Sequence, residues 1–108
     1  MRFIIFVIDD TSSSATGNEM AAIDAFNSRL NAGNHLLLAA GIAGTSRATL
    51  IDNRAGAGIE TQGSLFTAPE YYSGFWVISA ESEEQAKTFA REGSAACNRK
   101  VELRPFLG

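Results

Sequence analysis

The sequence predicts an α+β fold in which two helices cover one face of an antiparallel β-sheet. Short runs of β-branched and aromatic residues, bounded by turn residues, alternate with two segments whose apolar residues recur every three or four positions. Each of these two segments follows a helix-capping pattern. The 108 residues, 45% hydrophobic and 19% charged, correspond to a single globular domain at 1–108 with one core.

The first half of the chain predicts a strand, a loop, a helix and a strand. The apolar run "RFIIFVI" at 2–8 is typical of a strand, and Asp9 and Asp10 end it. Residues 11–18 have loop composition, and the capping box at 16–19 places a helix start near Gly17. Gly33 suits a left-handed residue that closes this helix, and "HLLLAAG" at 35–41 follows as a strand. The apolar helical face would consist of Met20, Ile23, Phe26 or Asn27, and Leu30.

The second half predicts a hairpin, a strand, a helix and a last strand. Strands at 47–52 and 59–63 flank the turn sequence "NRAGAG", and "GFWVISA" at 74–80 is a further strand. A second capping box at 82–85 begins a helix with Ala86, Phe89 and Ala90 on one face. The final run "KVELRPF" alternates, so Val101 and Leu103 face one way while Lys100, Glu102 and Arg104 face the other.

This element order predicts a ferredoxin-like sheet, or split βαβ arrangement, with both helices on one face. The strands at 2–8 and 74–80 are apolar on both of their faces, and the helices can cover only one. An uncovered apolar sheet face is rare in soluble monomers. We therefore expect a homodimer packed sheet to sheet, with a cavity between the sheets or at their rim.

Composition excludes several classes of function. A net charge of −3 and nine scattered basic residues argue against a nucleic-acid partner. The longest apolar run at the N-terminus is far shorter than the ~20 residues of a membrane span, and the lone Cys97 suits a reducing compartment. We expect a cytoplasmic protein without a membrane partner. One histidine and one cysteine do not make a metal site, and no cofactor is expected.

Several of these segments together resemble the YCII-related, or DGPF-domain, family. They are "AFNSRLNAGNHLLLAAGI", the hairpin, "GFWVI", the second helix with its Ser-x-x-Gln pattern, and "VELRPF". The resemblance implies a ferredoxin-like fold that dimerises into an α/β barrel, and a biochemistry that is largely unassigned. The family's Asp-Gly-Pro-Phe signature falls on 63–66, where only Phe66 matches, and a histidine that one branch carries in the first helix falls on Ala22. Both departures argue against carrying a catalytic role over.

Two polar residues are candidates for chemistry. Because a free histidine side chain titrates near neutral pH, His35 is a possible general acid or base, although a histidine hydrogen-bonded to backbone at a strand end is the more common arrangement. Arg104 would look toward the dimer face, where a guanidinium either clamps a ligand carboxylate or forms an ion pair with Glu102 or a partner carboxylate. The neighbours Asp9 and Asp10 would diverge along a strand, so ending that strand is their expected role.

The aromatic stretch at 61–76 is the candidate wall of a pocket. Phe66, Tyr71 and Tyr72 are expected in the connection that leads to the strand of Trp76, with Ser64 at the signature position. Aromatic walls with a few polar groups are typical of ligand sites, although a dimer interface has a similar composition. The sequence therefore favours a dimer that binds a small anionic or aromatic ligand. Alternatives are an enzyme that uses His35 on a small aromatic or lactone-like substrate, and a regulatory partner of other proteins.

Overall fold

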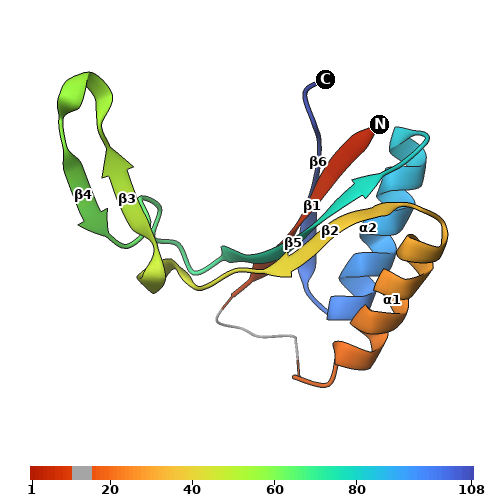
Figure 1. The fold of residues 1–108 in the computed structure, drawn as a ribbon. Coiled ribbons are helices and arrows are strands. Elements are labelled where there is room, and N and C mark those ends of the chain that lie inside the picture. The colour runs from red at the N-terminus through yellow and green to blue at the C-terminus, as the bar shows by residue number, and fades with distance from the viewer. Residues whose placement is uncertain (11–15) are drawn as a thin grey trace.

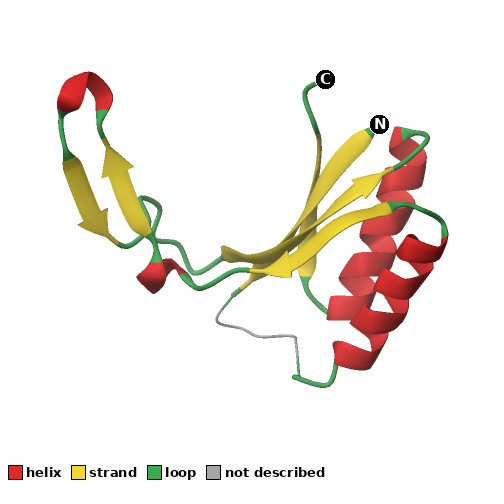
Figure 2. Ribbon diagram, in the orientation of Figure 1, coloured by secondary structure: helices red, strands yellow, loops and turns green. Residues whose placement is uncertain are grey.

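The computed structural model describes residues 1–10 and 16–108, so the first part of the expected loop at 11–18 lies outside the described residues. A four-stranded antiparallel sheet has the strand order β2-β5-β1-β6, and two helices lie together on one of its faces (Figure 1; Figure 2). The predicted ferredoxin-like fold class is confirmed. The elements are β1 (Arg2–Asp9), α1 (Met20–Ala32), β2 (Leu36–Gly41), β3 (Thr49–Asp52), β4 (Ile59–Gln62), β5 (Tyr71–Ser79), α2 (Glu83–Cys97) and β6 (Lys100–Pro105). Within the described residues, no helix has the length and apolar character needed to cross a membrane.

The core lies between the two helices and the sheet. Alternate residues of β1 and β5 are buried on the helical side, and the apolar positions of α1 and α2 meet them. Phe26 of α1 packs edge-on against Trp76 of β5, with 5.2 Å between the ring centroids. The buried face of α2 consists of small residues, which allows this helix to approach the aromatic pair closely. The buried core residues are Phe3, Ile5, Phe26, Leu30, Trp76, Ile78, Ala80, Ala86, Ala90 and Cys97.

The ends of α1 differ from the sequence prediction, whereas the start of α2 agrees with it. Helix α1 begins at Met20, three residues later than expected, because the Glu19 carboxylate accepts hydrogen bonds from the backbone N–H groups of Thr16 and Gly17 and forms a turn ahead of the helix. The left-handed residue after α1 is Asn34 with a φ of 60°, not Gly33. At α2, the Ser82 hydroxyl accepts from the backbone N–H of Gln85 at 3.1 Å, as the capping box predicted.

The central strands present apolar residues on the face of the sheet opposite the helices. This agrees with the prediction that these strands are apolar on both of their faces. Phe6 and Ile4 of β1 lie beside Phe75 and Val77 of β5, and all four are half-buried. We call this surface the open face. No helix of the described chain covers it (Figure 2). The prediction that the helices shield only one side of the sheet is therefore confirmed.

Strands β3 and β4, which follow β2 and precede β5 along the chain, form a separate hairpin. We call it the arm (residues 49–62), and it projects from the main sheet (Figure 1). Its register pairs Thr49 with Gln62 and Asp52 with Ile59. The radius of gyration of the Cα atoms is 15.8 Å. A compact chain of this length has a value of about 13 Å. The projecting arm explains the difference.

Candidate functional site

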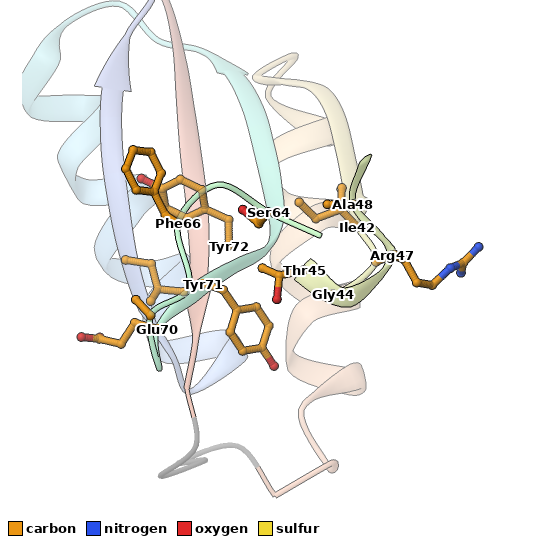
Figure 3. A pocket seen from close by; sticks show the side chains of 13 residues that line it. Ile42, Gly44, Thr45, Arg47, Ala48, Ser64, Phe66, Glu70, Tyr71 and Tyr72 are labelled. Carbon is orange, nitrogen blue, oxygen red and sulfur yellow. The ribbon is translucent and has the colours of Figure 1, made fainter. Parts of the chain in front are cut away.

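A cavity of about 550 Å³ lies where the arm leaves the sheet. Three segments that are distant in sequence line it, namely the end of β1, the connection from β2 to β3, and the connection from β4 into β5 (Figure 3). Its volume is within the range of roughly 300–1,000 Å³ that is typical of small-molecule sites. The lining residues are Ile8, Ile42, Ala43, Gly44, Thr45, Arg47, Ala48, Ser64, Phe66, Ala68, Glu70, Tyr71 and Tyr72.

Backbone hydrogen bonds at the foot of the arm hold two of these segments together. The backbone N–H of Gly63 donates to the carbonyl of Ala48 at 2.7 Å, which closes the hairpin at its base. The N–H of Arg47 donates to the carbonyl of Gly44 at 3.0 Å and forms a single helical turn at Thr45–Arg47. Because the two chain segments are tied in this way, Thr45 and Ser64 line the same cavity although they are far apart in sequence.

The wall of the cavity is mainly aromatic and aliphatic, with hydroxyl groups between. Figure 3 shows Phe66, Tyr71 and Tyr72 on one side and Ile42 on the other, while Thr45 and Ser64 lie between them. Phe66 is 79% exposed, so its ring stands at the mouth of the cavity and contributes little to the core. The site therefore offers ring-stacking surfaces and neutral hydrogen-bonding groups.

The charged residues of the wall are directed elsewhere. The Arg47 guanidinium points away from the cavity (Figure 3). Glu70 pairs with the ammonium group of Lys100 at 2.8 Å. The interior therefore has little net charge to offer a ligand.

Tyr72 connects the cavity with the open face. Its ring stacks on Phe6 with 4.3 Å between centroids, and its hydroxyl donates a hydrogen bond to the Glu102 carboxylate. Arg104 donates to the same hydroxyl at 2.9 Å and to Glu102 at 2.7 Å, and its guanidinium lies 5.4 Å from the centroid of Phe6. The acceptor Glu102 raises the pKa of Tyr72 above its ordinary value, whereas hydrogen bonds from Tyr72 and Arg104 lower the pKa of Glu102.

The residues predicted for the site separate into two groups. Ser64, Phe66, Tyr71 and Tyr72 line the one cavity, although both tyrosines belong to strand β5 and not to the connection where they were expected. The strand extends over them because Tyr72 pairs with Ile8 and Tyr71 with Asp9 of β1. Trp76, His35 and Arg104 lie outside the cavity lining.

Trp76 faces the helices. It is 4% exposed, and its indole Nε1–H donates to Asn27 Oδ1 at 2.7 Å.

A second cavity of about 500 Å³ lies on this side, between α1 and the sheet, and includes Asp9 and Arg99 in its wall. These two residues form an ion pair at 3.0 Å. Their charges therefore neutralise each other, and Asp9 ends β1 as expected.

His35 lies just before β2, on the helical side of the sheet. Its Nδ1 is 2.8 Å from the carbonyl oxygen of Ser79, and its ring packs on Phe89 of α2 with 4.7 Å between centroids. Because a carbonyl can only accept, Nδ1 carries the proton. A Cβ atom at Gly33 would lie 2.7 Å from His35 Cδ2, so the glycine makes room for this ring. His35 is therefore hydrogen-bonded to backbone at the strand end, which is one of the two alternatives considered for it from the sequence.

Sequence reasoning named Arg104 but missed its connection to Tyr72. The alternation in "KVELRPF" places Glu102 and Arg104 on one face, and β6 does present them to the open face, opposite Phe6 and Ile4. The contact with Tyr72 depends on the register of both neighbours of β1, which no local pattern encodes. Cys97 ends α2 inside the core, where burial raises the pKa of its thiol.

Together, the fold and the cavity define a ferredoxin-like α+β protein with a small-molecule-sized cavity at the end of its sheet. The chain belongs to the YCII-related domain family, whose family model matches residues 1–106. Among solved structures it is similar to 5-chloro-2-hydroxyhydroquinone dehydrochlorinase (TftG) from Burkholderia phenoliruptrix AC1100 in complex with 2,5-dihydroxybenzoquinone. The TM-score is 0.60 with 16% sequence identity, over 99% of this chain and 94% of that one, so the similarity is one of fold. No curated protein sequence matches the chain.

Proposed function

We propose that the protein is a homodimer that binds a small, oxygen-substituted aromatic compound in the cavity at the foot of the arm. The observation that carries this proposal is the composition of the wall, in which three aromatic rings and the aliphatic hydroxyl groups of Thr45 and Ser64 line a volume of about 550 Å³. Aromatic side chains stack on a planar ligand, and hydroxyl groups recognise ring oxygens without a charge requirement.

The charges around the cavity favour a neutral or weakly acidic ring over a strong anion. Arg104 already donates to Glu102 and Tyr72, and Arg47 points away (Figure 3). A ligand carboxylate would have to compete with Glu102 for the guanidinium of Arg104. The similarity of fold to a protein solved in complex with 2,5-dihydroxybenzoquinone supports a six-membered ring with oxygen substituents. That compound is an anion at neutral pH, so the preference for a less acidic ring rests on the charges of this cavity alone.

The binding proposal is tested by isothermal titration calorimetry with 2,5-dihydroxybenzoquinone, catechol and phenol. Phe66→Ala removes a ring that stands at the cavity mouth and is mostly exposed, so the fold is retained. Loss of one stacked ring costs about 0.5–1.5 kcal/mol, or roughly a two- to thirteenfold increase in Kd. Leu65→Ala is the matched control, because Leu65 is adjacent and 63% exposed but does not line the cavity. Equal affinity in wild type and Phe66→Ala would contradict this location of the site.

An enzyme in the same cavity is the second candidate, and the position of Tyr72 favours it. Its hydroxyl lies at the edge of the cavity, where it donates to Glu102 and accepts from Arg104, and it would protonate a bound ring oxygen by turning its O–H away from Glu102. Turnover of a bound compound that is lost in Tyr72→Phe while binding remains would support this reading. His35 lies outside this cavity and is bonded to the Ser79 carbonyl, so His35→Ala should leave such turnover unchanged, and a loss of turnover there would favour the alternative that uses His35. A protein that binds none of these ring compounds would favour the regulatory alternative.

The homodimer is proposed because the open face is apolar and because the cavity reaches it through Tyr72 and Ile8. A second copy packed on this face would exclude water from Phe6 and Val77, and would place the cavity at the rim of the interface. Sedimentation equilibrium at micromolar concentrations tests this. Val77→Glu puts a charge in the centre of the face and should yield a monomer, whereas Met20→Glu, on the helical side, should remain dimeric. A monomeric wild type would refute the dimer.

A further inference from the structure

We propose that the arm of each chain docks on a second copy of the same chain, beyond the sheet-to-sheet contact. This inference rests on the proposed dimer and specifies how it is held together. Few contacts within the described chain stabilise the arm, which is why a partner surface is considered for it.

Within the described residues, neither strand of the arm pairs with the main sheet or packs extensively on a helix. Strands β3 and β4 have four residues each and form a sheet of their own, separate from the main sheet. An isolated two-stranded hairpin of this size is at best marginally stable in water. Ile51 and Ile59 are 60% and 51% exposed, which leaves apolar surface where only solvent meets it. A further surface is therefore needed to stabilise the hairpin.

The arm carries apolar residues on both faces. Because Ile51 pairs with Glu60 and Asp52 pairs with Ile59, the two isoleucines lie on opposite faces, and Leu50 shares the face of Ile59. An exposed edge hairpin that served only as a spacer would carry polar residues at these positions. The pattern is that of an element inserted between two surfaces.

The tip is held in one shape by its own side chains. The Asp52 carboxylate pairs with Arg54 at 2.8 Å, and Asn53 Oδ1 accepts from the backbone N–H of Gly58 at 3.0 Å. The foot is closed by the hydrogen bond from Gly63 to Ala48. The arm is thus ordered at both ends, so the ordering cost of docking falls mainly on its exposed middle.

A second copy is the partner that the geometry favours. The sheet has four strands about 4.8 Å apart, and its edge strands of six residues are about 20 Å long, which gives a face of roughly 400 Å² in projection. A stable interface buries about 800 Å² of accessible surface on each partner, and the apolar residues of the arm would add to the surface that the sheet supplies. The arm rises on the side that the helices leave open (Figure 1), where the copy that covers the sheet would lie. In a two-fold dimer both arms would make this contact.

Docking would also affect the cavity. Ala48 and Ser64, at the two ends of the arm, form part of the cavity wall. When the arm is held by the partner, these residues are held as well. Ligand binding and dimerisation are then linked, and each should strengthen the other.

Sedimentation equilibrium of an arm variant provides the test. Ile51→Thr combined with Ile59→Thr keeps β-branched side chains, and therefore strand propensity, but removes the apolar contact surface. We expect the dimer Kd to rise at least tenfold. Met20→Gln is the control, because Met20 is 65% exposed on the helical side, and its Kd should equal that of wild type.

The outcomes separate the two proposals. An unchanged Kd in the arm variant, with Val77→Glu monomeric, would overturn the arm contact and leave the sheet-to-sheet dimer intact. A monomeric wild type would overturn both. Hydrogen exchange supplies an independent readout: amides of 49–62 should be protected above the dimer Kd and exchange rapidly after dilution below it. Protection that persists in the monomer would contradict the inference.

Discussion

Replacing Asn27 by alanine tests the part of the core that orients β5 and, with it, the aromatic wall of the cavity. The side-chain oxygen of Asn27 accepts the indole N–H of Trp76 at 2.7 Å, and Trp76 is only 4% exposed. Asn27 and Trp76 both border the second cavity, so water can replace the missing acceptor only in part. The variant should therefore fold but be less stable than wild type.

The magnitude follows from two opposing effects. A buried donor without its partner costs about 1–3 kcal/mol, and the higher helix propensity of alanine returns about 0.5 kcal/mol. The net loss is about 0.5–2.5 kcal/mol, with a decrease in Tm of roughly 6 °C near the middle of this range. Asn31→Ala is the matched control, since Asn31 is exposed on the same helix, and this variant should be as stable as wild type or slightly more so.

The assay is thermal and urea unfolding followed by circular dichroism, with all variants at one protein concentration because dimerisation contributes to stability. Trp76→Phe, alone and combined with Asn27→Ala, completes a double-mutant cycle. In the Trp76→Phe background the donor is absent, so Asn27→Ala should cost much less. An equal cost of Asn27→Ala in both backgrounds would refute the role of this hydrogen bond.

Two further predictions concern the sheet. Gly74→Ala should destabilise the protein by about 1–3 kcal/mol, because a Cβ there would lie 2.8 Å from the carbonyl oxygen of Ala40, whereas Gly44→Ala, with open space around it, should have little effect on chemical unfolding. The Tyr72 pKa should lie above its ordinary value of about 10 and fall towards it in Glu102→Gln, followed by the ¹³Cζ shift of Tyr72. Since its folded-state pKa is raised, Tyr72 contributes stability below pH ~10, and the contribution is lost as pH rises through the raised value. Glu102, with a lowered pKa, contributes above pH ~4.3, and its contribution is lost as pH falls through the folded-state value. A Tyr72 pKa that Glu102→Gln leaves unchanged would contradict this assignment.

Local patterns in the sequence were sufficient for the fold because they report on burial and on chain geometry. Two-sided apolar runs identified the central strands, and Ser82 with Gln85 marked the start of α2 through a short-range hydrogen bond. The same reasoning misplaced the start of α1. The Glu19 carboxylate does accept from the backbone N–H of Thr16, as a capping box predicts, but the Thr16 hydroxyl donates to that carboxylate, and Glu19 itself precedes the helix without a side-chain cap. A capping pattern supplies the bonding groups but does not decide which of two nearby turns they close.

The candidate site was predicted only in part, because its members come from segments that are distant in sequence. The aromatic content around Phe66 and the tyrosines pointed to a wall, but the opposite wall, from Ile42 to Ala48, carried no signal of its own. His35 was a candidate acid or base only because of its residue type. Its neighbours, Ser79 and Phe89, give it a packed, backbone-bonded position on the other side of the sheet from the open face.

By itself, then, the sequence determined the order of strands and helices, the ferredoxin-like class, and the presence of apolar residues on both sides of the sheet. These properties depend on periodicity, capping and burial, which act over a few residues. The tertiary structure decided which aromatic residues enter the core and which line the cavity. Trp76 went to the helices and Tyr72 to the open face, because the register between β1 and β5 shifts between Val7 and Ile8 and sets the facing of each side chain that follows.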